Sequence, residues 1–425
     1  MRIPSDALLR ARLRVLDWAR RRRLLRFLRL GQLLGACIAN RSRLPDAIAR
    51  YLVAGNHSTD SPRWTALALR QCKHTRRTRS GATKLERSAL LKAPQGPNER
   101  GVLLLSFEAE LEALVTSTAF EEIERRYLIA FLPTWQPAHS APLFSLAARS
   151  RRPFVVMPAS QADLALPAVL GRLCSTIPLQ ACNWAAAADF QAHEPRGVRD
   201  IDILMLANFG SYKRHWRLFE GLAQLPVRLR VVVAGPPWEG RTAASIRREA
   251  RAFGVDERIE ILPNRSYAEV AGLMRRARLL CAMSHKEGSY IAVAEALLAG
   301  TPVAMYQNAL IGSKIYINDR SGILLDDHVP LGPQLLDALH VADTLNPAAW
   351  AASTLSAEVS AGILNSHLRR TALSHGEHWT LDTVEFCCRN FSFAYTDPAS
   401  CVVLREDYEW LREQCNLTFS SAHAA

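Results

Sequence analysis

The stretch from Arg278 to Tyr306, RLLCAMSHKEGSYIAVAEALLAGTPVAMY, contains the pattern that decides the fold. An apolar run at 278–284 leads into the polar turn His285–Ser289. Residues 291–300 have the length and composition of a helix, and 301–306 form a second short apolar run. Short apolar runs that alternate with helices are typical of strands buried in a parallel sheet. The stretch therefore predicts a strand–helix–strand unit.

The same alternation continues in both directions along the chain. Further strands are predicted at 201–209, 227–235, 258–264 and 321–327, and helices at 215–225, 242–254 and 267–277. An earlier region has apolar runs at 101–107, 127–133 and 153–158 and a helical pattern at 111–126. This alternation predicts an α/β fold with doubly wound sheets, which bind ligands at the carboxyl ends of their strands.

Changes in composition mark the domain boundaries. A polar segment, HEPRGVR at 193–199, separates the two α/β regions. We predict four parts: a basic helical extension and linker over 1–99, an N-terminal α/β domain over 100–195, a C-terminal α/β domain over 196–345, and C-terminal helices over 346–425. Whether the last of these helices packs back on the N-terminal domain stays open.

The composition excludes several classes of protein. Of 425 residues, 49% are hydrophobic and 22% are charged, so the chain can bury a core. No uninterrupted apolar run reaches the roughly 18 residues of a membrane span. The nine cysteines form no Cys-x-x-Cys pair, which disfavours a zinc site or a disulfide scaffold and indicates a reducing compartment.

The positive charge is arginine-rich and concentrated at the N-terminus. The formal net charge is +13, and only six of the 53 basic residues are lysines. Residues 1–56 predict a basic helix that either lies on an anionic membrane or packs one face on its own domain. A signal peptide is a weaker alternative, because Arg26 and Arg29 interrupt the segment that should be apolar. No sequence motif supports specific nucleic-acid binding.

The turn at 285–289 has the chemistry of an anion site. It follows a predicted strand and precedes a predicted helix, whose first N–H groups and positive dipole end favour a bound anion. Gly288 and Ser289 allow the backbone to approach a ligand closely, and Lys286 adds a positive charge. Glu287 and Glu295 are eight positions apart, or about 12 Å along a helix. Glu295 either receives ligand hydroxyls or pairs with an internal arginine.

A second polar cluster follows the first strand of the C-terminal region. ANFGSYKRHWRLFEGL, at 207–222, contains Lys213 and Arg214 just ahead of a predicted helix. Lys213 and Lys286 both follow strands that should be neighbours in the sheet. We expect a phosphate-binding site here; the alternative is a solvated run of charges.

Residues from about 200 to 330 resemble the nucleotide-sugar-binding domain of family-4 retaining glycosyltransferases with the GT-B fold. The resemblance rests on Glu287-Gly288, on Glu295-Ala296, and on Gly300-Thr301-Pro302-Val303. GPPWEGR at 235–241 and CNWAAAADFQ at 182–191 add weaker matches. The resemblance implies two Rossmann-like domains that face a cleft.

The roles of the family's residues carry over to the matching positions. The resemblance implies that Glu287 binds the transferred sugar and that Lys213 binds the diphosphate and stabilises the leaving group. It further implies that Glu295 holds the donor ribose and that Gly288 and Ser289 cap the phosphate. Lys286 and Arg214 are added as donor-binding candidates. No metal and no other cofactor is expected.

Three features depart from the family pattern. Asn208, a further donor-binding candidate, stands where the family usually has an arginine. The turn after Glu287 lacks the second glycine, and the first strand of the N-terminal region is not followed by a glycine-rich loop. His139 follows a predicted strand and is a candidate on the acceptor side.

These observations predict a cytoplasmic glycosyltransferase that transfers a sugar from a nucleotide-sugar donor to a glycan or lipid-linked acceptor. Cell-envelope or exopolysaccharide synthesis is the expected setting, and peripheral binding to the inner face of the cytoplasmic membrane stays open. The alternative is a non-catalytic module of the same fold that binds nucleotide or glycan.

Overall fold

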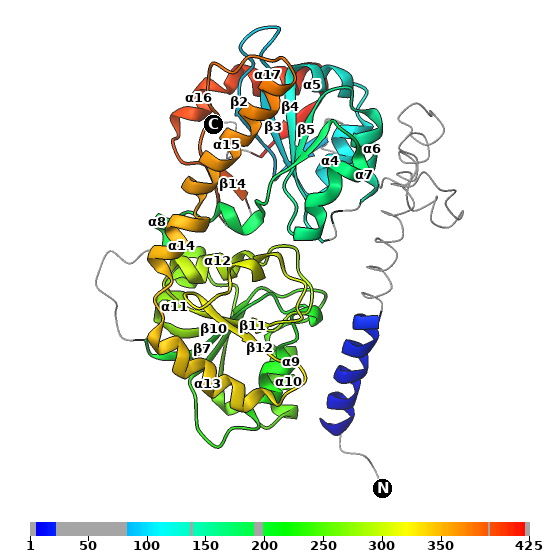
Figure 1. Cartoon of the computed structure of the whole chain (residues 1–425). Helices are drawn as coiled ribbons and strands as arrows, with labels where there is room; N and C mark the ends of the chain where they lie inside the picture. Colours follow the sequence, from blue (N-terminus) through cyan, green and yellow to red (C-terminus); the bar gives the residue numbers. More distant parts are fainter. Residues whose placement is uncertain are drawn as a thin grey trace. The chain divides into compact units, whose positions relative to one another are not determined.

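The computed structural model describes residues 6–22, 83–136, 138, 140–190, 199–389 and 392–420. The chain divides into two compact units. The first comprises Met1–Arg26 and Ala185–Ser356, and the second comprises Phe27–Trp184 and Ala357–Ala425. Figure 1 shows the elements of both units in sequence colours.

A six-stranded parallel sheet forms the centre of the first unit, in the order β12-β11-β10-β7-β8-β9. Its strands are β7 (Ile201–Leu206), β8 (Val231–Gly235), β9 (Ile259–Pro263), β10 (Ala277–Ala282), β11 (Val303–Tyr306) and β12 (Gly322–Leu325). The chain builds outward from β7 to β9, then returns to the other side of β7 with β10. The direction of winding therefore reverses between β7 and β10, and ligands bind at such a switch point in open α/β sheets.

Helices cover both faces of this sheet (Figure 1). They are α8 (Ala187–Phe190), α9 (His215–Leu222), α10 (Ala243–Ala252), α11 (Tyr267–Arg276), α12 (Ile291–Leu298), α13 (Leu331–Thr344) and α14 (Ala348–Leu355). Contacts link α9 with α10 and α13, whereas α12 contacts α8, α11 and α14. β10 is buried over five of its six residues. Burial on both faces explains why the strands read as continuous apolar runs.

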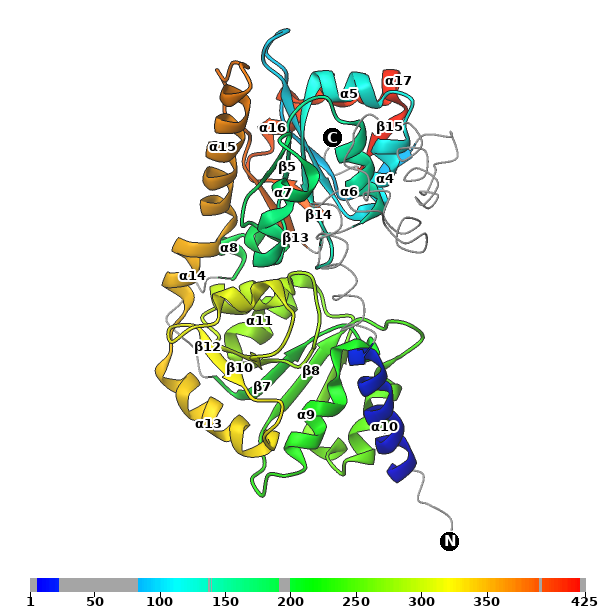
Figure 2. The same ribbon diagram turned by 45° about the vertical axis from the view of Figure 1, so that its right-hand side comes forward.

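The N-terminal helix, residues 6–22, belongs to the first unit and lies beside α9 and α10 (Figures 1 and 2). Arg14 pairs with Glu220 of α9 at 2.6 Å, and Arg10 donates to the carbonyl of Ala252 in α10. Residues 6–22 of the predicted extension are therefore docked on the C-terminal α/β domain.

The second unit has a five-stranded sheet in the order β2-β3-β4-β5-β6, with β2 antiparallel and the others parallel. These strands are β2 (Ala89–Lys92), β3 (Gly101–Ser106), β4 (Tyr127–Leu132), β5 (Phe154–Val156) and β6 (Cys174–Thr176). Its described helices before residue 185 are α4 (Glu108–Thr116), α5 (Phe120–Arg126), α6 (Ala141–Arg149) and α7 (Leu166–Leu170). β3 and β4 are buried throughout and supply the centre of the core.

The C-terminal part of the chain contributes both helices and strands to the second unit. It contains α15 (Ala357–Ser374), β13 (Phe386–Arg389), β14 (Ser392–Tyr395), α16 (Ala399–Val403), α17 (Arg405–Cys415) and β15 (Leu417–Phe419). On α17, Asp407 accepts hydrogen bonds from Tyr127 at 2.6 Å and from Arg126 at 2.8 Å. The last helix therefore contacts the N-terminal α/β domain directly.

The segment just before residue 100 differs from its prediction as a linker. Residues Thr83–Leu85 form β1, which pairs with β15, and β2 adds an antiparallel edge to the sheet. Lys92 is buried with Glu99 at 2.6 Å, so even the polar residues here are internal. Composition alone does not show that the charges of this segment are buried in an ion pair. A segment rich in charged residues and proline is therefore predicted to be a linker.

Gly235, at the end of β8, provides a test of close backbone packing. A Cβ atom there would lie 2.0 Å from the carbonyl oxygen of Ala207, which precedes the Lys213 loop. We expect Gly235→Ala to lower the free energy of unfolding by about 1–3 kcal/mol, because backbone must move to admit the methyl group.

Gly272→Ala is the matched control for Gly235→Ala. Gly272 lies in α11, and a Cβ atom there has 4.0 Å to its nearest neighbour. Alanine should be neutral or stabilising by up to about 1 kcal/mol at this position. Equal thermal melting temperatures for the two variants would contradict the close approach at Gly235.

Candidate functional site

The candidate site lies at the carboxyl ends of β7 and β10. These strands pair in parallel, with Leu204 opposite Leu280. The loop after β7 leads through a 3₁₀ turn, η4 (Ser211–Lys213), into α9, and the loop after β10 leads into α12. The reversal of winding thus brings both predicted clusters to one edge of the sheet.

Lys213 and Glu287, the two predicted catalytic residues, are in contact. Lys213 Nζ lies 2.6 Å from Glu287 Oε1, and Ser284 Oγ donates to the same oxygen at 2.7 Å. Lys213 Nζ also lies 4.0 Å from the centre of the Tyr290 ring. Both charged side chains are buried, with exposed fractions of 7% and 6%. A buried ammonium next to a carboxylate suits a ligand that carries both an anionic group and hydroxyls.

Backbone hydrogen bonds hold the 285–289 turn in place. Glu287 N donates to Leu310 O at 3.0 Å, and Gly312 N donates to Gly288 O at 2.7 Å. The next residue, Ser289, is buried and accepts from Ser313 N at 3.2 Å. Lys286 forms an isolated β-bridge with Leu310, and burial lowers the pKa of its ammonium. The turn is therefore fixed by the segment that follows β11.

Helix α12 begins directly after this turn. Its N-cap residue, Tyr290, has a left-handed backbone with φ 55°, makes no side-chain cap hydrogen bond, and donates its hydroxyl to Leu206 O at 2.8 Å. This bond ties the start of α12 to the end of β7. The helix therefore starts beside the Lys213–Glu287 pair, where its positive dipole end favours an anion.

Glu295 lies further along α12, near Tyr267 of α11 and Asp189 of α8. Burial raises the pKa of Glu295 to about 7; the charge of Asp189 adds to the shift, and a hydrogen bond with Tyr267 opposes it. Among the described residues, its neighbours are therefore a hydroxyl and another carboxylate, and no described interaction pairs it with an arginine. Its role toward a ribose stays a prediction.

Asn208 and Arg214 have partners within the protein. Asn208 Oδ1 accepts from Gly210 N at 3.1 Å, and its Nδ2 donates to Tyr212 Oη at 2.9 Å, so it shapes the loop ahead of Lys213. Arg214 is 2% exposed, and its Nε lies 3.0 Å from Asp17 Oδ1. These contacts favour supporting roles for both residues over direct contact with a donor.

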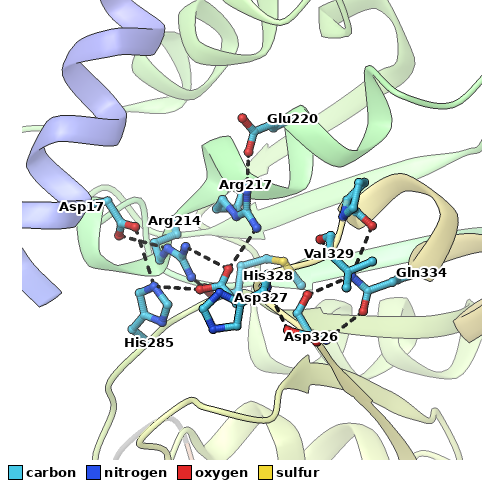
Figure 3. Close-up of polar contacts among 12 residues, drawn as sticks. Asp17, Arg214, Arg217, Glu220, His285, Asp326, Asp327, His328, Val329 and Gln334 are labelled. Carbon is cyan, nitrogen blue, oxygen red and sulfur yellow. Dashed lines mark hydrogen bonds and ion pairs between the residues drawn. The ribbon is translucent and has the colours of Figure 1, made fainter.

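A cluster that the sequence did not reveal surrounds Arg214 (Figure 3). Its members come from three places: Asp17 from the N-terminal helix, Asp327 from the end of β12, and His285 from the loop after β10. The Asp326-Asp327 pair at the end of the predicted strand 321–327 was a usable signal, because it places carboxylates at the same edge of the sheet. Asp17 had no such signal, since it stands within a run of arginines.

Other expected features have the following outcomes. The acceptor-side candidate His139 lies outside the described residues. Within the parts of the chain that the structure describes, no group of three or more His, Cys, Asp or Glu residues could hold a metal ion. No described helix is both long enough and apolar enough to cross a membrane.

Solved structures of other proteins are similar to this chain. HepE of Anabaena, solved in complex with UDP, is similar with a TM-score of 0.50 and 18% identity, over 64% of this chain and 78% of that chain. Sucrose-phosphate synthase from Thermosynechococcus elongatus gives a TM-score of 0.47 with 17% identity, over 64% of this chain and 73% of that one. The fold is the GT-B fold of glycosyltransferases, which confirms the predicted fold class.

The sequence comparisons give a family match for the C-terminal α/β domain. Residues 188–330 match the family described as Glycosyl transferases group 1. A GDP-mannose:cellobiosyl-diphosphopolyprenol alpha-mannosyltransferase from Komagataeibacter xylinus is 28% identical over 184 residues, or 43% of this chain. The match spans 45% of the length of that relative.

The raised pKa of Glu295 makes a prediction about stability and pH. A carboxyl group whose pKa is raised to about 7 in the folded protein, from an ordinary value of 4.5, destabilises the fold once it ionises. The wild type should therefore lose stability relative to Glu295→Gln as the pH rises from about 4.5 to 7. Above that range we expect the variant to be more stable by on the order of 2 kcal/mol.

Thermal melting of both proteins at pH 5 and pH 8 measures this effect. Glu269→Gln is the control, because hydrogen bonds with Ser266 lower the pKa of the exposed Glu269 to about 2. That variant should gain nothing at pH 8. A Glu295→Gln advantage that is equal at both pH values would contradict the raised pKa.

Proposed function

We propose that the protein is a retaining glycosyltransferase that transfers a hexose from a nucleotide-sugar donor to a glycan or lipid-linked acceptor. The observation that carries the proposal is the buried Lys213–Glu287 pair at the switch point of the domain that matches the group 1 family. We propose cell-envelope or exopolysaccharide synthesis as the setting. The name of the Komagataeibacter relative, with a polyprenol-linked acceptor, supports this setting and makes GDP-mannose the first donor to test.

The residues of the pair have complementary tasks in this reaction. Departure of a nucleoside diphosphate builds negative charge, so fixed positive groups at that point lower the barrier. Lys213 and the N-terminus of α12, with the amides of Gly288 and Ser289, supply that positive charge. Glu287 can only accept hydrogen bonds when ionised, which suits hydroxyls of the transferred sugar. Glu295, farther along the same helix, would hold the donor ribose. We propose that Lys286 adds charge at the phosphates and that no metal is required.

Loss of Lys213 or Glu287 should sharply lower turnover in variants that still fold. We expect Lys213→Ala to lower kcat by about 100–1,000-fold, the usual effect of removing one such donor. Glu287→Gln keeps the shape of the side chain but loses the charge, and should have an effect of similar size. Donor turnover is measured with GDP-mannose, UDP-glucose and related sugars, in buffer with and without EDTA.

Lys84→Ala is the control for this experiment. Lys84 is exposed and forms a surface ion pair with Glu86 at 3.3 Å in the second unit. Its removal should leave kcat unchanged. Full turnover by both site variants would reject the assignment of the pair, and loss of turnover in EDTA would reject metal independence.

A second candidate function has support from specific observations. Asn208 replaces the family's arginine, and only Phe107, with φ 70°, separates β3 from α4. No glycine-rich loop follows β3, so a non-catalytic module that binds nucleotide or glycan is the alternative. Nucleotide binding that depends on Glu295, without turnover of any donor, would favour the module over the enzyme.

We further propose that the enzyme is cytoplasmic and binds the anionic inner face of the cytoplasmic membrane through the outer face of its N-terminal helix. Leu8, Val15 and Trp18 are 54%, 63% and 56% exposed on this face. Arg22 stacks on Trp18 at 4.4 Å, and Arg12 is exposed beside them. Apolar side chains flanked by arginines suit the boundary between headgroups and acyl chains.

Co-sedimentation with vesicles tests the membrane proposal. The double variant Val15→Asp/Trp18→Asp should bind vesicles of anionic phosphatidylglycerol at least tenfold more weakly than the wild type, because it loses apolar area and gains negative charge. Val402→Asp, at a residue of α16 that is 61% exposed, is the control and should bind normally. Equal binding of all three proteins would rule out the helix as the contact.

A further inference from the structure

The cluster around Arg214 links the N-terminal helix to both loops of the candidate site. Arg214 Nε lies 3.0 Å from Asp17 Oδ1 and its Nη2 lies 3.6 Å from Asp327 Oδ1. His285 Nε2 lies 3.7 Å from Asp17 Oδ2 and 3.6 Å from Asp327 Oδ2. Figure 3 shows Asp17 approaching this group from the N-terminal helix, opposite Asp327.

The cluster lies one or two residues from the charged pair of the site. Arg214 follows Lys213 directly, and His285 precedes Glu287 by two positions. Arg214 Nη1 also donates to Met283 O at 3.2 Å, which ties the loop after β7 to the loop after β10. The position of Arg214 therefore affects how the two loops lie next to each other.

The charges of the cluster explain why Asp17 matters to this arrangement. Arg214 and Asp17 are both buried, and Arg217 and Arg21 add positive charge by pairing with Asp327 at 2.9 and 2.5 Å. These three arginines thus share Asp17 and Asp327, and Arg217 also pairs with Glu220 at 2.5 Å. Of these three carboxylates, Asp17 alone comes from the N-terminal helix. Although burial opposes it, the nearby His285 and the charge of Arg214 lower the pKa of Asp17 to about 2, so it is ionised at neutral pH. A buried guanidinium that loses its carboxylate must move or take in water.

We propose that Asp17 is a positioning residue for the donor-phosphate site. It holds Arg214 and His285, and through them it fixes the two loops that carry Lys213 and Glu287. In this proposal the N-terminal helix contributes to donor binding, because it holds the loops of the site in position. This inference rests on the proposed function, because it names a residue that supports the same site.

Binding of nucleoside diphosphate by the full-length chain tests the proposal. We expect Asp17→Asn to weaken binding of GDP or UDP, whichever the wild type binds, by at least tenfold in titration calorimetry. The KM for the donor should rise by a similar factor with a smaller change in kcat. Asp17→Glu keeps the charge and should restore most of the affinity. Unchanged affinity in Asp17→Asn would overturn the proposal.

Arg10→Ala separates positioning from simple docking of the helix. Arg10 contacts Ala252 at the other end of the same helix and has no contact with the cluster among the described interactions. It should leave nucleotide affinity within twofold of the wild type. If Arg10→Ala weakens binding as much as Asp17→Asn does, helix docking in general is responsible, and the specific role of Asp17 is wrong.

Hydrogen exchange measured without ligand tests the positioning role of Asp17 independently of the proposed function. Asp17→Asn should speed amide exchange at least tenfold in peptides that cover 209–217 and 283–290, and Arg10→Ala and Asp17→Glu should not. If the wild type binds no nucleotide, the proposed function is wrong, but the exchange result still tests the role of Asp17 in holding the two loops. Unchanged exchange in both loops of a folded Asp17→Asn would overturn the positioning role. If that variant does not fold, Arg214→Lys takes its place, because it keeps the charge but cannot keep all the contacts of the guanidinium with Asp17, Asp327 and Met283. Faster exchange in both loops of this variant would support the role, and unchanged exchange would overturn it.

Discussion

The ion pair between Lys213 and Glu287 is the interaction on which the rest of the candidate site depends. It requires the carboxyl ends of β7 and β10 to be neighbours, which occurs only because the chain reverses its winding after β9. Burial strengthens the attraction between the two charges and also makes each costly without the other. Ser284 and Tyr290 then fix the carboxylate and the ammonium from the sides. The pair is thus held in place before any ligand arrives.

Two consecutive cations, Lys213 and Arg214, serve two different sets of carboxylates. The backbone of Arg214 is left-handed with φ 57°, and α9 begins at the next residue. This local turn lets Lys213 reach Glu287 while Arg214 reaches Asp17 and Asp327. A non-glycine residue in this conformation carries a cost that surrounding contacts must offset. The buried ion contacts of Arg214 are a direct source of that compensation.

The sequence predicts the first unit well because its strands are short, apolar and separated by amphipathic helices. It also places Lys213 and Glu287 together, since both follow neighbouring strands. It misses β1, β2, β6, β13, β14 and β15, because these strands have only three or four residues and stand in polar or helix-like surroundings. Asp17 is missed for another reason: charge and helical period do not say which face of a helix docks, or against what.

The structure of the N-terminal helix is compatible with both interpretations of its sequence, which are packing on its own domain and binding to an anionic membrane. Its inner face carries Asp17 and Arg21, and its outer face carries Val15 and Trp18. Arginines occur on both faces because the inner ones have partners: Arg14 pairs with Glu220 and Arg21 with Asp327. Only the remaining arginines add to any attraction for an anionic surface, so the formal charge of the segment overstates that attraction. Docking and the proposed membrane binding would therefore use different residues of one helix, and neither interaction would exclude the other.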